Sequence, residues 1–553
     1  MNDVAVLVGG KAGDGINSAG AMVAWLLNHL GYSVYVYFDY PSLIRGGHNY
    51  AIIRGSEQAK SPGTHNEKAD FILALDQATV ELHTGRRNAD SCLLFKKGLV
   101  KAEGVEVPVS DILLQENAPE IMGNSVIIGG FAKAAGIEWK TVEQVFNAHI
   151  PKGAEQNLRV ARHAYDQLAT IRPVPPCANP PRPLLTGNEA VGLGLVRGGL
   201  DAYVSYPMTP SSSLLHFLAG ESERFGITVV HPENEIAVIL MALGFAAAGK
   251  RAAVGTSGGG FCLMTEGLSL AGQAELPVVI LMSQRTGPST GLPTYTGQAD
   301  LRFVLHAGQG EFPRLVVAPC DASESILWSA RAMELAWRCQ VPAFILTDKT
   351  LSEGTYSTDL PVPDPPSAGI PAPWDGKGHY LRYANTPSGI SPLAFAGTPG
   401  AIVKVNSYAH DESGITTEEG PVNGMMAEKR AQKEQALMTE LAKFSQVEQS
   451  GVVDATTALL CWGSPGCACS EAGTRLGLAV VRPVVLSPFP KEQLRGALTG
   501  VTRLIAVEEN ATGQLASLAK ENGIMVTDTL LRYDGRPFTP DDLAVRIREV
   551  LKR

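Results

Sequence analysis

The stretch 252-AAVGTSGGGFCLMTEGLSLAGQAELPVVILMS-283 begins and ends with short apolar runs, with a glycine-rich turn and a helical pattern between them. Short apolar runs that alternate with helical patterns are typical of βαβ units in a parallel sheet. The same alternation extends upstream through 226-GITVV-230 to a helix that begins at Glu235. We therefore expect the central part of the chain to be an α/β domain built on a parallel sheet.

The alternation recurs on both sides of this block, first in 4-VAVLV-8 and 33-SVYVYF-38 and later in 457-TALLCWG-463 and 503-RLIAVEEN-510. Proline-rich stretches separate the blocks, and proline excludes regular helix and central strand. The sequence predicts an α/β fold with three domains of the parallel-sheet type. The predicted boundaries are 1–170 for the first domain, 171–187 for a linker, 188–357 for the central domain, 358–450 for a second linker with an irregular insertion and a charged helix, and 451–553 for the last domain.

The composition argues against nucleic acid as a main partner. The 553 residues carry 46 basic and 55 acidic side chains, a formal net charge of -9, and no long basic run. No window reaches the roughly 18 uninterrupted apolar residues of a membrane span, and the N-terminus lacks the pattern of a signal peptide. We expect no membrane association and a cytoplasmic location.

The eight cysteines have no repeated spacing. The tight group Cys461, Cys467 and Cys469 lacks the four-thiolate spacing that an iron–sulfur cluster needs. We interpret these three as buried or incidental thiols, and we expect no metal site in this chain.

Two front segments suit an anionic ligand. The loop 9-GGKAGDGINSAG-20 follows a strand and opens a helix, where backbone N–H groups can approach a phosphate. The segment 41-PSLIRGGHNYAIIRG-55 combines a fixed cation with backbone that allows close approach. Either it is a tight turn with a solvated arginine, or it contacts a phosphate or CoA through four consecutive residues. These are Arg45, Gly46, Gly47 and His48.

Glu235 begins a helix that is apolar nearly all round. A glutamate in the first turn is favoured by the helix dipole even when it is exposed. Because the rest of this helix is apolar, however, we expect the first turn to enter the interior together with its carboxyl group. A buried carboxyl group that keeps its proton can donate a hydrogen bond.

Several strings together resemble the alpha subunit of 2-oxoacid:ferredoxin oxidoreductases, above all the 2-oxoglutarate type, with a gamma-like domain fused in front. The resemblance covers almost the whole chain. The strings are 40-YPSLIRGGHN-49, 205-SYPMTPSS-212, the ENE at 233–235, the TSGGGF at 256–261, the QRTGPSTGLPT at 284–294, 389-GISPLAFAGTPG-400 and 410-HDESG-414.

The resemblance implies a thiamine diphosphate enzyme whose cofactor lies across two subunits. The first domain would be gamma-like, the central domain would bind the aminopyrimidine ring, and the last would be transketolase C-terminal-like. In such an enzyme Glu235 hydrogen-bonds the ring nitrogen N1′, Thr209 lies against the reacting end of the oxoacid, and Arg285 binds its carboxylate. An interdomain ion pair is the alternative for Arg285, and a simple turn is the alternative for the glycines. The other residues implied on the pyrimidine side are Pro207, Ser257, Gly258 and Gly259.

Two motifs of the complete enzyme are missing. The Gly13-Asp14-Gly15 triplet is not followed by the paired asparagines of the thiamine diphosphate magnesium motif, and no ferredoxin-type cysteine pattern is present. The resemblance therefore implies a separate beta subunit that holds the diphosphate, Mg²⁺ and a 4Fe-4S cluster, in an (alpha-beta)2 heterotetramer.

The implied reaction adds CoA to decarboxylated 2-oxoglutarate and passes electrons to ferredoxin. It could also run in reverse as a CO2-fixing synthase, as in a reductive TCA cycle. Pyruvate or a branched-chain oxoacid is the alternative substrate, and a non-catalytic scaffold subunit is the alternative function.

Overall fold

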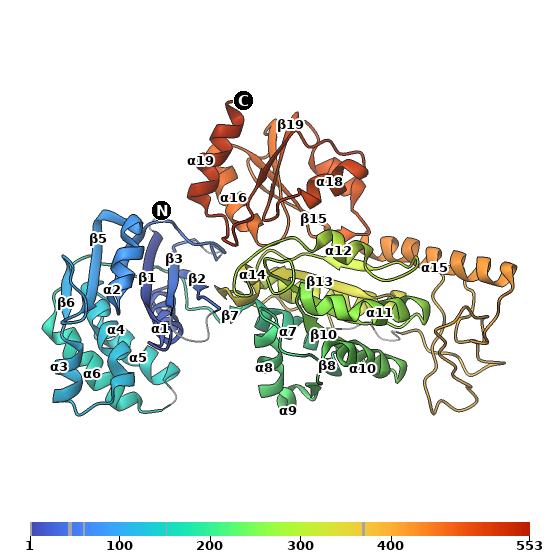
Figure 1. Ribbon diagram of the computed structural model, residues 1–553, viewed down its shortest axis with the longest axis horizontal. Coiled ribbons are helices and arrows are strands. Elements are labelled where there is room, and N and C mark those ends of the chain that lie inside the picture. Colours follow the sequence, from blue (N-terminus) through green and yellow to red (C-terminus); the bar gives the residue numbers. More distant parts are fainter. Residues whose placement is uncertain (1–2, 43–46, 59–60, 151, 366, 368–370) are drawn as a thin grey trace. The chain divides into compact units, whose positions relative to one another are not determined.

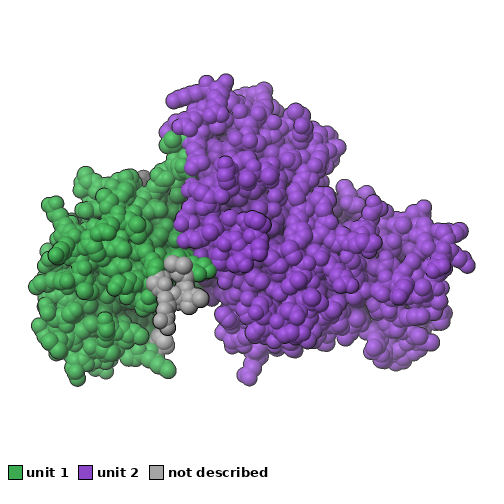
Figure 2. Space-filling view, viewed as in Figure 1, with its two compact units in different colours: residues 1–185, 353–359, 539–545 green, residues 186–352, 360–538, 546–553 purple. Residues whose placement is uncertain are grey.

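The computed structural model describes residues 3–42, 47–58, 61–150, 152–365, 367 and 371–553 (Figure 1). The chain divides into two compact units (Figure 2). The first comprises residues 1–185, 353–359 and 539–545, and the second comprises 186–352, 360–538 and 546–553. The domain boundaries that we predicted from the proline-rich linkers stay a prediction. Within the described ranges, no helix is both long and apolar enough to cross a membrane.

The first unit is built on an eight-stranded mixed sheet of order β6-β5-β4-β1-β3-β2-β14-β7. Strand β1 pairs in parallel with β4 but antiparallel with β3, because β3 returns directly after β2 and inserts between β2 and β1. The strands are β1 (Asp3–Lys11), β2 (Ser33–Asp39), β3 (His48–Ser56), β4 (Ala69–Ala74), β5 (Arg87–Lys96), β6 (Val105–Val107), β7 (Leu184–Thr186) and β14 (Thr355–Ser357).

Six α-helices accompany this sheet. Helices α4 and α6 pack closely because Gly129 of α4 has no side chain, and a Cβ there would overlap the Ala161 carbonyl of α6. The helices are α1 (Ile16–His29), α2 (Gln77–Leu82), α3 (Val109–Gln115), α4 (Gly123–Ala134), α5 (Trp139–His149) and α6 (Ala154–Gln167), with short 3-10 turns at Thr84–Arg86 and Glu120–Met122.

The second unit contains the central sheet, of order β18-β12-β13-β11-β10-β8-β9. All neighbours pair in parallel except β18, which is antiparallel to β12. The strands are β8 (Ala202–Val204), β9 (Thr228–Val230), β10 (Ala252–Thr256), β11 (Val279–Gln284), β12 (Leu315–Val317), β13 (Ala343–Asp348) and β18 (Val485–Ser487).

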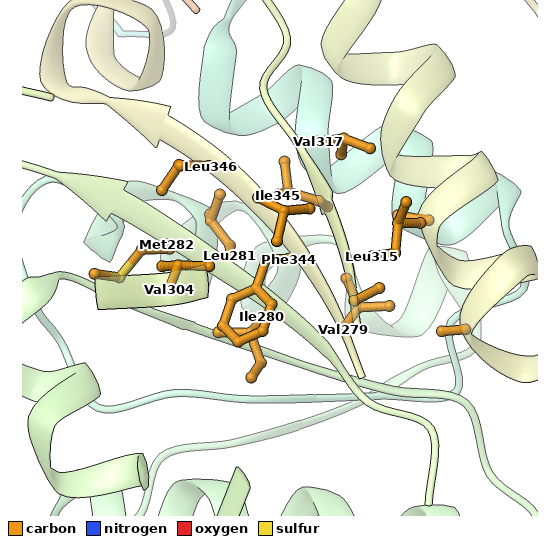
Figure 3. Close-up of a cluster of buried hydrophobic side chains, with 14 of the residues drawn as sticks. Val279, Ile280, Leu281, Met282, Val304, Leu315, Val317, Phe344, Ile345 and Leu346 are labelled. Atoms are coloured by element: carbon orange, nitrogen blue, oxygen red, sulfur yellow. The ribbon is translucent and has the colours of Figure 1, made fainter. Parts of the chain in front are cut away.

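The middle strands of the central sheet are buried on both faces, which explains their continuous apolar runs. Figure 3 shows side chains of β11, β12 and β13 packed together with Val304 of a covering helix. Every labelled side chain in this cluster is fully buried. The residues labelled are Val279, Ile280, Leu281, Met282, Val304, Leu315, Val317, Phe344, Ile345 and Leu346.

A third sheet, of order β15-β17-β16-β19-β20, follows in the same unit. Its strands are β15 (Val447–Gly451), β16 (Thr457–Leu460), β17 (Ala479–Pro483), β19 (Arg503–Glu508) and β20 (Asp528–Leu531). The apolar run 479–487 is not one strand: after Pro483 the chain leaves this sheet, and β18 joins the central one. The predicted α/β class with three sheet-based parts is confirmed, but none of the three sheets is purely parallel: β3 is antiparallel to β1 and β2, β18 is antiparallel to β12, and β15 is antiparallel to β17.

The helices of the second unit complete the fold. They are α7 (Gly187–Arg197), α8 (Ser212–Gly220), α9 (Ser222–Phe225), α10 (Glu235–Ala247), α11 (Gly258–Gln273), α12 (Leu301–His306), α13 (Ala322–Cys339), α14 (Lys349–Glu353), α15 (Gly420–Leu441), α16 (Pro465–Leu476), α17 (Lys491–Ala497), α18 (Gln514–Glu521) and α19 (Pro540–Leu551). The last residue of α14 and the N-terminal half of α19 belong to the first unit. Residues 377–419 form an irregular segment, and the charged helix after it ends at Leu441.

Helix α15 is attached to the central layer by buried charges. The Glu275 carboxylate lies 2.6 Å from Lys429 Nζ and also pairs with Lys433, and all three side chains are buried. Burial opposes ionisation of Glu275, but Lys433, Lys429 and Arg382 outweigh it and lower the pKa to about 2. The glutamate is therefore ionised, while burial lowers the pKa of Lys433 to about 7 against the effect of Glu275.

Hydrogen bonds join the central layer to the third sheet around Gln298, which is fully buried. Its backbone N–H donates to the Glu509 carbonyl at 2.7 Å, and its side chain donates to the Trp462 carbonyl at 2.8 Å. The Glu509 carboxyl group accepts from Phe538 N–H at 3.0 Å. Burial raises the pKa of Glu509 to about 8, and nearby Asp348 adds to the shift.

Candidate functional site

The SYPMTPSS loop connects β8 to α8 at the carboxyl end of β8, an inner strand of the central sheet. The Ser211 hydroxyl donates to the Met208 carbonyl at 2.7 Å, and Asn188 Nδ2 donates to the Pro210 carbonyl at 2.8 Å. Ser211 therefore closes the turn that precedes the helix and does not accept from a helix N–H. These bonds fix the backbone on either side of Thr209.

Glu235 is the first residue of α10, with a side chain that is only 4% exposed. The preceding Asn234 caps the helix by accepting from Ala237 N–H at 3.0 Å, so the Glu235 carboxyl group is not used as a cap. Its Oε1 atom is buried and has no hydrogen-bond partner among the residues that the structure describes. A buried polar atom without a partner costs on the order of 1–3 kcal/mol, which indicates a site that a ligand group completes.

The turn between β10 and α11 brings a second such atom. Ser257 is fully buried, and no described residue lies within hydrogen-bond reach of its hydroxyl oxygen. A Cβ added to Gly260 would lie 2.5 Å from Glu235 Oε1, while one added to Gly259 would meet only the Ser289 carbonyl at 3.8 Å. Glycine at 260 therefore makes the space in which the Glu235 carboxyl group lies.

Arg285 follows directly after β11 and reaches the SYPMTPSS loop. Its Nη1 donates to the Thr209 carbonyl at 2.8 Å, and its Nε is buried without a partner in the described part of the chain. The structure thus brings together Arg285 and Thr209, two residues expected from the sequence, through the backbone of Thr209. Pro207 lies half-buried in the same loop.

Asp300 is a member of this region that the sequence did not indicate. A Cβ on Gly258 would lie 3.0 Å from both of its carboxylate oxygens. Burial raises the pKa of Asp300 to about 6, against the opposing effect of Arg285. Burial also lowers the pKa of Arg285, against the effect of Asp300. No local pattern marks Asp300, because its neighbours come from separate strands.

The first unit gathers the expected anion-binding segments at one end of its sheet. Ala12 N–H donates to the Gly47 carbonyl at 3.1 Å, so the loop 9–20 lies beside Gly47 and His48. Arg45 and Gly46 lie outside the described residues.

His48 has a partner that sequence reasoning missed. Its Nε2 lies 2.9 Å from His83 Nε2, and its Nδ1 lies 3.9 Å from Asp76. Burial lowers the pKa of His48, although Asp76 opposes this. Burial, His48 and Arg86 lower the pKa of His83 to about 3. Both rings are therefore neutral near pH 7.

The cysteines occupy varied positions. Cys461 and Cys469 are buried, Cys467 is half-buried, and all three are free thiols. Over the described ranges, no three His, Cys, Asp or Glu side chains are grouped so that they could hold a metal ion.

Comparison with known proteins gives matches over nearly the whole chain. Residues 194–429 match the family model for pyruvate flavodoxin/ferredoxin oxidoreductase, thiamine diphosphate-binding, and residues 5–167 match that for pyruvate ferredoxin/flavodoxin oxidoreductase. The chain is 31% identical to the 2-oxoacid:ferredoxin oxidoreductase subunit alpha of Saccharolobus solfataricus, over 99% of this chain and 98% of that one.

Two further matches carry the name of one substrate. The chain is 26% identical to the 2-oxoglutarate oxidoreductase subunit KorA of Mycobacterium tuberculosis, over 100% of this chain and 92% of that one. It is also similar to the solved 2-oxoglutarate:ferredoxin oxidoreductase from Magnetococcus marinus with 2-oxoglutarate, coenzyme A and succinyl-CoA bound. The TM-score is 0.90 and the identity 28%, over 99% of each chain.

Proposed function

Because this chain belongs to the 2-oxoacid:ferredoxin oxidoreductase family of alpha subunits, we propose that it is the fused gamma-alpha subunit of a thiamine diphosphate-dependent 2-oxoglutarate:ferredoxin oxidoreductase. The proposed reaction converts 2-oxoglutarate and CoA to succinyl-CoA and CO2, with two electrons passed to ferredoxin, and it is reversible as a CO2-fixing synthase. The 2-oxoglutarate names of the relatives support this substrate. The observation that carries the proposal is the buried, unpartnered oxygen of Glu235.

The residues around Glu235 fit the pyrimidine half of thiamine diphosphate. Glu235 Oε1 and the Ser257 hydroxyl are buried polar atoms without partners. The ring of the cofactor carries nitrogen atoms that can complete such bonds, and the bound cofactor supplies the carbanion-stabilising centre that decarboxylation needs. Glu235 would hold a proton at its carboxyl oxygen and donate it toward ring nitrogen N1′. Pro207, Gly258 and Gly259 would border the ring.

Arg285 would bind the carboxylate of the oxoacid. One side of its guanidinium group is fixed by the Thr209 carbonyl, and its Nε is left without a partner. A guanidinium held at one end presents its remaining N–H groups in a fixed plane, which suits a carboxylate. Thr209 would position the reacting end of the substrate, and Asp300 would balance the charge of Arg285.

The proposal requires a partner chain. The sequence lacks a magnesium-diphosphate motif and a ferredoxin-type cysteine pattern. We infer that a beta subunit supplies Mg²⁺, the diphosphate site and a 4Fe-4S cluster, and that two alpha-beta pairs form a heterotetramer. The sheet end at Gly47 and His48, with Arg45 and Gly46, would contact CoA.

Pyruvate or a branched-chain oxoacid is the second candidate substrate, because the matching family models are named for pyruvate. A scaffold without catalysis is the third reading. The buried position of the unpartnered Glu235 oxygen argues against it, because a buried polar atom without a partner destabilises the fold and a site without function would not retain it.

The test is anaerobic viologen reduction by the chain co-expressed with its beta subunit, with 2-oxoglutarate or pyruvate and CoA. We expect activity that requires both chains and is higher with 2-oxoglutarate. Glu235→Gln should lower the rate about a hundredfold or more, while the exposed Glu266→Gln on α11 serves as the matched control. Full activity of Glu235→Gln would refute the catalytic role, and a preference for pyruvate would refute the substrate.

A further inference from the structure

Two thiols meet where the central layer contacts the C-terminal part of the second unit. Cys320 lies in the loop between β12 and α13, and Cys467 lies in the first turn of α16. Their sulfur atoms are 3.2 Å apart although the residues are separated by 147 positions. Cys467 Sγ also lies 3.8 Å from the Cys320 carbonyl oxygen.

The surrounding residues bring the two sulfurs together. A Cβ on Gly466 would lie 3.0 Å from Cys320 Sγ and 2.5 Å from the Arg482 side chain, so only glycine allows α16 to approach this closely. Glu324 accepts from Cys320 N–H at 2.9 Å and from Arg482 Nη1 at 2.9 Å. The loop that carries Cys320 is therefore anchored to the same ion pair that borders α16.

Access differs between the two thiols. Cys320 is 5% exposed, whereas Cys467 is half-buried, so a small reagent reaches Cys467 first. The hydrogen bond with Cys467, together with burial, raises the pKa of Cys320, so Cys320 is a thiol near pH 7. Cys461 and Cys469 are hydrogen-bonded to each other and fully buried.

We propose that Cys320 and Cys467 form an oxidisable dithiol that a peroxide converts into a disulfide between the central layer and the C-terminal part. The Cys467 sulfur attacks one peroxide oxygen, which gives a sulfenic acid and one water. The Cys320 sulfur then attacks Cys467 Sγ and displaces the hydroxyl group as a second water. In total, two thiols and one hydrogen peroxide become one disulfide and two waters, a transfer of two electrons.

The step needs little movement. A disulfide bond is about 2.05 Å long, so the sulfurs must approach by only about 1.2 Å from their present 3.2 Å. Because the bond closes a long loop of chain, it should restrict the unfolded state strongly. A dithiol reductant reverses the reaction by thiol–disulfide exchange.

The test uses the full chain, reduced and then treated with hydrogen peroxide. Peptide mapping by mass spectrometry without reduction should find a Cys320–Cys467 cross-link that dithiothreitol removes, and the Tm should rise by about 4 °C or more. Cys467→Ser and Cys320→Ser should each abolish both effects, while Cys461→Ser should abolish neither. In Cys320→Ser the sulfenic acid on Cys467 should persist and react with dimedone.

Three results would overturn the proposal. They are the absence of the cross-link in the folded wild-type chain, a cross-link from Cys467 to another cysteine, and dimedone labelling of Cys467 in the wild type equal to that in Cys320→Ser. Because the reaction needs no oxoacid, cofactor or partner chain, its failure is distinct from failure of the proposed function.

Discussion

The substitution Gly260→Ala offers the sharpest test of the position of Glu235. The added Cβ would lie nearest to the Thr256 hydroxyl, and next to it 2.5 Å from Glu235 Oε1 and 2.9 Å from Glu235 Cγ. Ordinary contact begins at about 3.4 Å. The carboxyl group must therefore retreat by about 0.9 Å, while the backbone of α11 can remain helical.

Two magnitudes follow from this displacement. A misplacement of about 1 Å can lower a rate about a hundredfold, so we expect kcat to fall between about tenfold and a hundredfold. Overpacking costs about 1–3 kcal/mol, whereas alanine gains about 1 kcal/mol over glycine within a helix. The free energy of unfolding should consequently fall by no more than about 2 kcal/mol.

The assay compares anaerobic viologen reduction and urea unfolding for Gly260→Ala and for Gly496→Ala. Gly496 lies in α17, and a Cβ there meets nothing within 4 Å, so this control should keep full activity and gain slightly in stability. A Gly260→Ala enzyme that is folded, displaces Glu235 and still works at the wild-type rate would refute the reasoning that this carboxyl position sets the rate.

Three further predictions use ionisable groups that are buried or half-buried. Asp300→Asn should remove an inflection near pH 6 from the profile of kcat/KM, because the wild-type carboxyl group has its pKa raised to about 6 beside Arg285; an unchanged profile would exclude Asp300 from substrate binding. The pKa of Glu509 rises from 4.5 to about 8 on folding, so the wild type loses stability as pH rises from about 4.5 to about 8. In urea unfolding at pH 8, Glu509→Gln should therefore be more stable than the wild type by a few kcal/mol, since a pKa unit is worth about 1.4 kcal/mol. Near pH 4.5 the two proteins should differ little, and the opposite trend would contradict this. Glu275→Gln should lower the free energy of unfolding by about 3–5 kcal/mol because Lys429 and Lys433 lose their anion, and a loss under 1 kcal/mol would show that the lysines find other partners.

Local patterns predicted much of the central fold. The apolar runs at 252–256 and 277–283 correspond to β10 and β11, and Glu235 is buried as expected, although Ile236, Leu240 and Met241 of the same helix are exposed. What the sequence could not predict depends on contacts between distant segments. The departure of β18 from the third sheet follows a single proline within one apolar run, and nothing local distinguishes the two sheets that its halves join.

The sequence predicted the candidate site only in part, and again it predicted the residues that local patterns mark. Glu235, Thr209 and Arg285 stand in recognisable strings, although their roles stay predictions. Asp300 and His83 became apparent only through their neighbours, Gly258 and His48, which lie 42 and 35 positions earlier in the chain.

The pairing of β18 with β12 has a consequence for how the protein is synthesised. Strand β12 is complete once residue 317 has left the ribosome, but the strand that covers its outer edge ends at residue 487. For all of that interval the nascent central sheet presents unpaired backbone groups, which other chains can bind. Aggregation during translation should therefore depend on how fast the part of the message for residues 318–487 is read, so slow codons in that part would lower the yield of soluble protein.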